Sequence, residues 1–194
     1  MVSYTRPKNL REWLVRAALP GPQRPRTLRP AATGFRPCRR ANCTLCRRTD
    51  APIKSYKCSV TGTQITVGNI SCQDVGVYII VCAKSSGQCR DLRPTYVGEC
   101  GDGDNSSFTH RYAGHLGSAT NRSQEHTTKP VGSHFRLPGH VPDRDMVMIP
   151  IERIAEAFTR KARESFYIQK LETLKRLPVT EIEHRLNLSR GQTL

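Results

Sequence analysis

The chain has 194 residues, of which 31 are Lys or Arg and 16 are Asp or Glu, giving a formal net charge of +15 at pH 7. This length is enough for one domain with tails or for two small domains. No stretch approaches the roughly 20 apolar residues that a membrane-spanning helix needs. Basic residues interrupt the apolar part of residues 1–19, so this segment lacks the core of a signal peptide. We therefore expect neither a membrane protein nor a secreted one.

The positive charge is concentrated near the start of the chain. Residues 1–48 contain twelve Lys or Arg and a single acidic residue, Glu12. A basic arm beside a more balanced remainder favours a polyanionic partner, above all nucleic acid. The alternative is a solvated, Arg-rich linker.

Hydrophobic periodicity and turn residues predict the elements in chain order. A short helix is predicted over 9–19, followed by a Pro- and Arg-rich linker over 20–30. Apolar runs then predict three strands, over 64–68, 75–82 and 95–98.

The second half of the chain adds two helices and a strand. A helix is predicted over 108–118, capped by Ser106 or Ser107, and a strand near 145–150. Apolar residues at helical spacing predict a second helix over 151–176. This order of elements indicates a small α/β domain, with helices against a mixed or antiparallel sheet.

The eight cysteines allow either disulfides or metal sites, and without a sign of secretion we favour metal sites. Cys82 and Cys89 with His134 and His140 offer two thiolates and two imidazoles, the ligand set of a structural Zn²⁺. The alternative is two buried free thiols and two surface histidines.

A second cysteine group lies upstream, at Cys38, Cys43 and Cys46, and it needs a fourth ligand. Cys58 and Cys72 are both candidates, and a disulfide pair is the alternative in an oxidising compartment. Four arginines flank this knuckle and are expected to contact backbone phosphates: Arg39, Arg40, Arg47 and Arg48.

Short motifs further along the chain occur in a characteristic order. They are Gly76-Val77-Tyr78, Tyr96-Val97-Gly98, Arg111 with His115, Glu164, and Leu186-Asn187. In this order they resemble the GIY-YIG endonuclease domain. Over residues 34–187 the chain is most similar to the C-terminal endonuclease of Penelope-like retroelements.

Further residues carry the likeness to the retroelement branch. Two cysteines lie between the tyrosine motifs, and a His-Phe pair is followed by a second histidine. The last helix carries an acidic, aromatic and aliphatic pattern: Glu164, Tyr167, Ile168, Leu171 and Thr173. The resemblance also favours Cys72 as the fourth ligand of the upstream knuckle.

The resemblance implies an α/β (α+β) fold of the GIY-YIG type. Its central, mostly antiparallel three-stranded sheet would be flanked by helices and extended by zinc-stabilised insertions. We expect three parts: a basic helix and Pro/Arg-rich linker over 1–33, a Cys-rich knuckle and lead-in strand over 34–72, and the GIY-YIG endonuclease domain over 73–190.

The activity that the resemblance implies is that of a metal-dependent DNA nickase. It would hydrolyse one phosphodiester to leave a 3′ hydroxyl, which in retroelements primes reverse transcription at the target site. The implied partners are DNA, RNA and a reverse transcriptase domain, without a membrane, in the nucleus. The alternative is a catalytically inactive, zinc-bearing nucleic-acid-binding module derived from a retroelement.

The implied catalytic residues suit this chemistry. Glu164 is a hard oxygen ligand for Mg²⁺ or Mn²⁺, on a helix face that also carries Arg160 and Lys161. Arg111 offers a planar charged fork for a phosphate. The other implied roles belong to Tyr78 or Tyr96 as general base, with Tyr78 favoured, to His115 near the nucleophile or phosphate, and to Asn187, which orients the site.

Overall fold

The computed structural model describes residues 34–48, 52–101, 103, 106–121, 129–174 and 185–187. The helix predicted over 9–19 and the linker over 20–30 therefore lie outside the described residues. Within the described ranges, no helix is long and apolar enough to cross a membrane.

A three-stranded antiparallel sheet forms the centre of the fold. Its strands are β5 (Gly76–Cys82), β6 (Thr95–Cys100) and β7 (Met146–Arg153), in the order β6-β5-β7. Every residue of β5 is buried, which explains its continuous apolar run, because neighbours flank it and side chains cover both of its faces. The predicted central sheet is confirmed, and all of its pairings are antiparallel.

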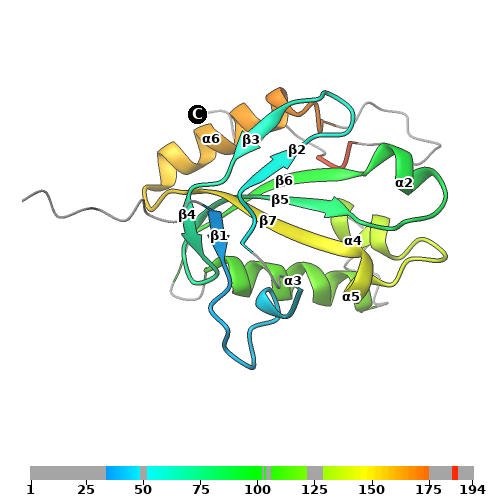
Figure 1. Cartoon of the computed structure of the whole chain (residues 1–194), viewed down its shortest axis with the longest axis horizontal. Helices are drawn as coiled ribbons and strands as arrows, with labels where there is room; N and C mark the ends of the chain where they lie inside the picture. Colours follow the sequence, from blue (N-terminus) through cyan, green and yellow to red (C-terminus); the bar gives the residue numbers. More distant parts are fainter. Residues whose placement is uncertain are drawn as a thin grey trace, which may run out of the picture. The chain divides into compact units, whose positions relative to one another are not determined.

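Helices lie on opposite sides of this sheet. Figure 1 shows α3 (Phe108–Thr120) below the strands and α6 (Ala157–Lys170) above them. Both helices bury aromatic residues in the core, Phe108 and Tyr112 from α3 and Tyr167 from α6. The sheet is thus covered on both faces.

Three short helices complete the domain. A connecting helix, α2 (Gln88–Leu92), lies between β5 and β6, while α4 (Pro130–Phe135) and α5 (Pro142–Asp145) precede β7. Of these, α4 lies beside α3. These helices were not predicted from the sequence, because they are too short to show a hydrophobic period.

Two small sheets precede the central one. The parallel pair joins β1 (Gly34–Arg36) to β4 (Asn69–Ser71), and a hairpin joins β2 (Ser55–Lys57) to β3 (Gln64–Thr66). The strand predicted over 64–68 therefore exists, but it belongs to the hairpin. A 3-10 turn, η1 (Cys46–Arg48), follows β1.

The helix predicted over 151–176 begins later than expected, and it ends earlier, at Lys170. Residues up to Arg153 continue β7, because they pair with the start of β5. The helix starts after Glu156, whose carboxylate accepts hydrogen bonds from the backbone N–H groups of Phe158 and Thr159. For α3 the predicted cap is confirmed, since the Ser107 hydroxyl accepts from the His110 N–H.

Gly76 is required where β5 meets the end of β7. Its φ is +152°, and a Cβ there would lie 2.0 Å from the backbone oxygen of Glu152. We expect Gly76→Ala to lower the free energy of unfolding by roughly 2–4 kcal/mol. Urea unfolding at constant free zinc measures this.

Gly117→Ala is the matched control, because a Cβ at this position in α3 would meet nothing within 4 Å. It should raise stability by roughly 0.5–1 kcal/mol. Equal destabilisation by the two substitutions would contradict the close approach at Gly76.

Candidate active site and metal centres

The centre of the candidate site is the hydroxyl group of Tyr78. This side chain is fully buried, and its hydroxyl lies 2.7 Å from Nε2 of His115 and 3.1 Å from Nε of Arg111. An arginine only donates, so the Tyr78 oxygen accepts from Arg111 and its proton is free to be donated to His115. Both partners come from α3, where His115 follows Arg111 by four positions and lies on the same face.

His115 is held as a neutral imidazole. Burial lowers its pKa to about 3, and the positive charges of Arg111 and Lys129 act in the same direction. A neutral Nε2 can accept the Tyr78 proton. The structure therefore joins three predicted residues in one hydrogen-bonded group.

Tyr96 borders a pocket that Tyr78 does not reach. The pocket has a volume of about 220 Å³, and Tyr96, Arg111, His115 and Lys129 are among its lining residues. The ring centroids of Tyr96 and His115 are 5.6 Å apart, and those of the two tyrosines 6.4 Å. The tyrosine that faces the pocket is thus Tyr96, whereas the sequence favoured Tyr78 as the base.

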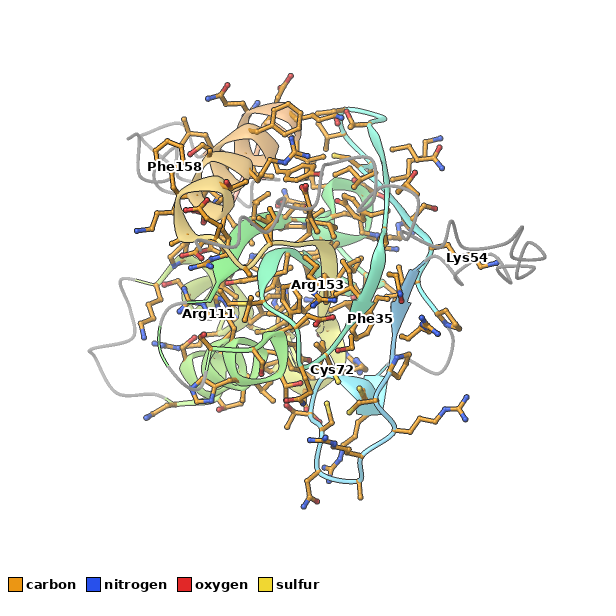
Figure 2. All side chains as sticks on the ribbon, turned by 90° about the vertical axis from the view of Figure 1, so that its left-hand side faces the viewer. Phe35, Lys54, Cys72, Arg111, Arg153 and Phe158 are labelled. Atoms are coloured by element: carbon orange, nitrogen blue, oxygen red, sulfur yellow. The ribbon has the colours of Figure 1, made fainter. Side chains whose placement is uncertain are left out.

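Glu164 reaches the same region from α6. Burial raises its pKa to about 7, the negative charge of Glu99 adds to this, and Arg111 opposes it. The Glu164 charge in turn raises the pKa of Tyr96, after burial as the main cause. Figure 2 shows Arg111 between the ribbons of α3 and α6.

Arg160, which the sequence places on the same helix face as Glu164, is not exposed to a ligand. Its side chain is fully buried, and it forms an ion pair with Glu99 of β6 and donates to the backbone oxygen of Ala155 at 3.0 Å. Gly101 makes room for it, because a Cβ there would lie 2.3 Å from the guanidinium carbon. Arg160 therefore attaches α6 to β6 and is not available to a ligand.

Asn187 is buried against strand β6. Its amide oxygen accepts from the Val97 N–H at 2.9 Å, and its amide nitrogen donates to the Val97 oxygen at 2.7 Å. Both polar groups of the side chain are used on the backbone next to Tyr96. This geometry suits a residue that orients the site, which is the role implied for Asn187.

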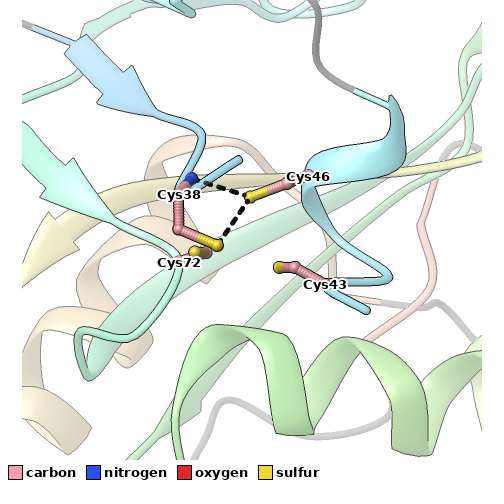
Figure 3. A group of neighbouring side chains, drawn as sticks. All are labelled: Cys38, Cys43, Cys46 and Cys72. Atoms are coloured by element: carbon pink, nitrogen blue, oxygen red, sulfur yellow. Dashed lines mark hydrogen bonds between the residues drawn. The ribbon is translucent and has the colours of Figure 1, made fainter. Parts of the chain in front are cut away.

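The upstream cysteines converge with Cys72, as predicted. Ligand atoms of Cys38, Cys43, Cys46 and Cys72 all lie within 4.8 Å of one another, and Figure 3 shows the four side chains pointing toward a common centre above α3. All four are free thiols, with 3.5 Å between the sulfurs of Cys38 and Cys46. Four convergent thiols are compatible with a structural zinc ion.

The second predicted quartet also comes together. Cys82, Cys89, His134 and His140 have their ligand atoms within 4.8 Å of one another, and the Cys89 sulfur is 3.3 Å from Nε2 of His140. Burial raises the pKa of Cys82 to about 12, so a bound cation would be needed to hold its thiolate. Two thiols and two imidazoles are compatible with structural zinc.

The two quartets support the walls of the pocket. Cys43 contacts the Thr109 hydroxyl at 3.3 Å, and the backbone oxygen of Cys72 accepts from the Thr109 N–H at 3.0 Å, so the first quartet abuts the start of α3. His134 of the second quartet lies on α4, which packs on α3. The searched residues of the described ranges contain no third group of this kind.

Sequence reasoning missed Glu99, Lys129 and the buried role of Arg160. Glu99 directly follows the Tyr96-Val97-Gly98 motif, which was the one available signal. Lys129 directly precedes the short helix α4 and belongs to no motif. Its place at the pocket depends on how α4 packs on α3, which no local sequence pattern indicates.

No protein-family model, no curated protein and no solved structure matches the chain.

We expect purified protein to contain two zinc ions per chain, one for each quartet. Cys43→Ser and His140→Gln should each lower this to one, because each removes a ligand from a different quartet. Elemental analysis by mass spectrometry measures the stoichiometry.

Cys100→Ser is the control, since Cys100 is a buried free thiol outside both quartets. It should keep both zinc ions. Loss of one ion in this variant, or two ions retained in His140→Gln, would contradict the assignment of ligands.

Because His115 is held neutral, the stability of the protein should depend on pH. The folded pKa of His115 is about 3, against about 6.5 in the unfolded chain, so over this window the unfolded state binds the extra proton. The contribution of His115 to the free energy of unfolding is therefore fully present above pH 6.5, and it is lost as the pH falls toward 3. His115→Gln should have a lower free energy of unfolding than the unsubstituted chain at pH 7.5. This difference in free energy should be smaller at pH 5.

Denaturant unfolding at both pH values measures this difference, with His110→Gln as control because His110 is exposed on the same helix. A difference that is constant or widens in acid would show that His115 is not held neutral.

Proposed function

We propose that this protein is a metal-dependent DNA endonuclease of the GIY-YIG type, which nicks one strand and leaves a 3′ hydroxyl. The observation that carries the proposal is the gathering of Tyr96, Arg111 and His115 at one pocket, with Tyr78 hydrogen-bonded beneath. These residues come from three separate elements, β5, β6 and α3. The resemblance to the endonuclease of Penelope-like retroelements gives them a common chemistry.

Arg111 is the phosphate-binding residue of the proposal. One of its nitrogens, Nε, is committed to the Tyr78 hydroxyl, and within the described ranges its guanidinium forms no salt bridge with a carboxylate. Its remaining N–H groups can donate to phosphoryl oxygens, where negative charge develops during hydrolysis.

Tyr96 is the tyrosine placed to meet the attacking water, because it borders the pocket. Burial and the charge of Glu164 hold its proton in place, whereas Arg111 favours the phenolate. Tyr78 holds Arg111 and His115 in position through its hydroxyl. Asn187 fixes the backbone of β6 beside Tyr96.

Glu164 would hold Mg²⁺ or Mn²⁺, which supplies Lewis-acid activation of the phosphodiester when bound. The charges around Glu164 suit a cation. Burial and the negative charge of Glu99 raise the pKa of Glu164 to about 7, so a positive ion beside it would stabilise its carboxylate. The negative charge of Glu164 raises the pKa of Tyr96. A metal cation bound to Glu164 would offset that charge and so favour loss of the Tyr96 proton.

A zinc-bearing module that binds nucleic acid without cutting it is the second candidate. It is favoured by the first quartet, whose knuckle exposes Arg39, Arg40 and Arg47. These arginines would contact backbone phosphates in either function. RNA, a reverse transcriptase domain and a nuclear location belong to the proposal on the resemblance alone.

Nicking of supercoiled plasmid by zinc-loaded protein tests the proposal. Open circles should form with Mg²⁺ or Mn²⁺ and not when the divalent ion is omitted at constant zinc. Glu164→Gln should lower the rate on the order of 100-fold or more, because it removes the oxygen charge that holds the metal.

Glu172→Gln is the matched control, since Glu172 is exposed just beyond the end of α6. It should nick at the unsubstituted rate. If folded protein with both zinc ions binds DNA but never nicks it, the binding module is the function.

A further inference from the structure

We propose that the pocket between α3 and α4 is a phosphodiester subsite, in which Lys129 and Arg111 together bind one backbone phosphate of the DNA. This inference rests on the proposed function and deepens it, because it names a further residue, outside the motifs, that contacts the substrate.

The pocket has the size and lining for one phosphate unit. Its volume of about 220 Å³ equals that of about seven water molecules at roughly 30 Å³ each, enough for a phosphate with part of its sugar. Arg111 and His115 line it from α3, Lys129 and Val131 from α4 and its start, and Tyr96 from β6. Among the described residues that line it there is no carboxylate.

Lys129 adds a positive charge to this pocket, and no described carboxylate forms an ion pair with it. Its side chain is exposed, it makes no capping hydrogen bond, and within the described ranges it forms no ion pair. Burial is the main cause of the lowered pKa of His115, and the positive charges of Arg111 and Lys129 lower it further. Two positive charges therefore face one pocket from two separate elements, an arrangement that attracts an anion.

The wall that carries Lys129 is firmly attached to α3. Gly132 lies against Ser118, where an added Cβ would be 3.0 Å from the Ser118 oxygens, and Arg136 donates to the Ser118 backbone oxygen at 2.7 Å. His134 ties the same helix to Cys89 through the second quartet. The start of α4, from which Lys129 extends, is thus held against α3, the helix that carries Arg111.

Lys129→Met tests the subsite by fluorescence anisotropy with labelled DNA, with Ca²⁺ in place of Mg²⁺ so that no strand is cut. We expect affinity to fall about five- to tenfold and the slope of log K against log salt to decrease by about 1. Lys129→Arg should restore both. Lys57→Met, at an exposed lysine of β2 outside the pocket, should change neither.

A second measurement does not depend on any variant. Titration of the unsubstituted protein with the thymidine dinucleotide TpT, which holds a single phosphodiester, should shift the amide signals of His115, Lys129 and Val131 in nuclear magnetic resonance spectra. Shifts confined to other parts of the protein would overturn the subsite.

The outcomes separate this inference from the proposed function. Unchanged affinity and salt slope in Lys129→Met, or equal losses in Lys57→Met, overturn the subsite even if the protein nicks DNA. A loss specific to Lys129, together with TpT shifts in the pocket, supports the subsite even if nicking is never observed, in which case the endonuclease proposal alone fails.

Discussion

The constraint on which the candidate site depends is the burial of one phenol. Tyr78 lies in the middle of the central strand with no exposed surface, so its hydroxyl needs partners inside the protein. An unpartnered buried hydroxyl would cost about 1–3 kcal/mol. The partners are Arg111 and His115, and because both lie on α3, this helix must dock with that face toward the sheet. The same docking brings Arg111 and His115 beside Tyr96 and opens the pocket between α3 and α4.

Two metal-ligand quartets hold this arrangement from either end. The first abuts the start of α3 through Thr109, and the second holds α4, which closes the other side of the pocket. Structural zinc contributes roughly 10 kcal/mol or more to folding, more than the net stability of many small domains. Zinc in the two quartets would therefore stabilise the walls of the pocket as well as the fold, although no quartet residue is among the described residues that line the pocket.

The parts that could be predicted from the sequence are those with a local signal. The three central strands are apolar runs, and the cap at Ser107 is a local motif. Ligand type indicates the metal quartets except for Cys72, which the family resemblance favoured over Cys58. The burial of Arg160 could not be predicted, because it depends on Glu99, 61 residues away in sequence, and on the missing side chain of Gly101. The continuation of β7 to Arg153 likewise depends on pairing with β5, which outweighs the helical period of the same residues.

The most direct measurement is the single-turnover rate of plasmid nicking by the Tyr78→Phe variant at saturating Mg²⁺, with both zinc ions retained. This substitution keeps the ring in the core and removes only the hydroxyl that holds Arg111 and His115. If the hydrogen-bonded group is the centre of a nuclease site, the rate should fall on the order of 10- to 100-fold while DNA affinity changes little. A folded, zinc-loaded Tyr78→Phe protein that nicks at the unsubstituted rate would contradict the role of this group.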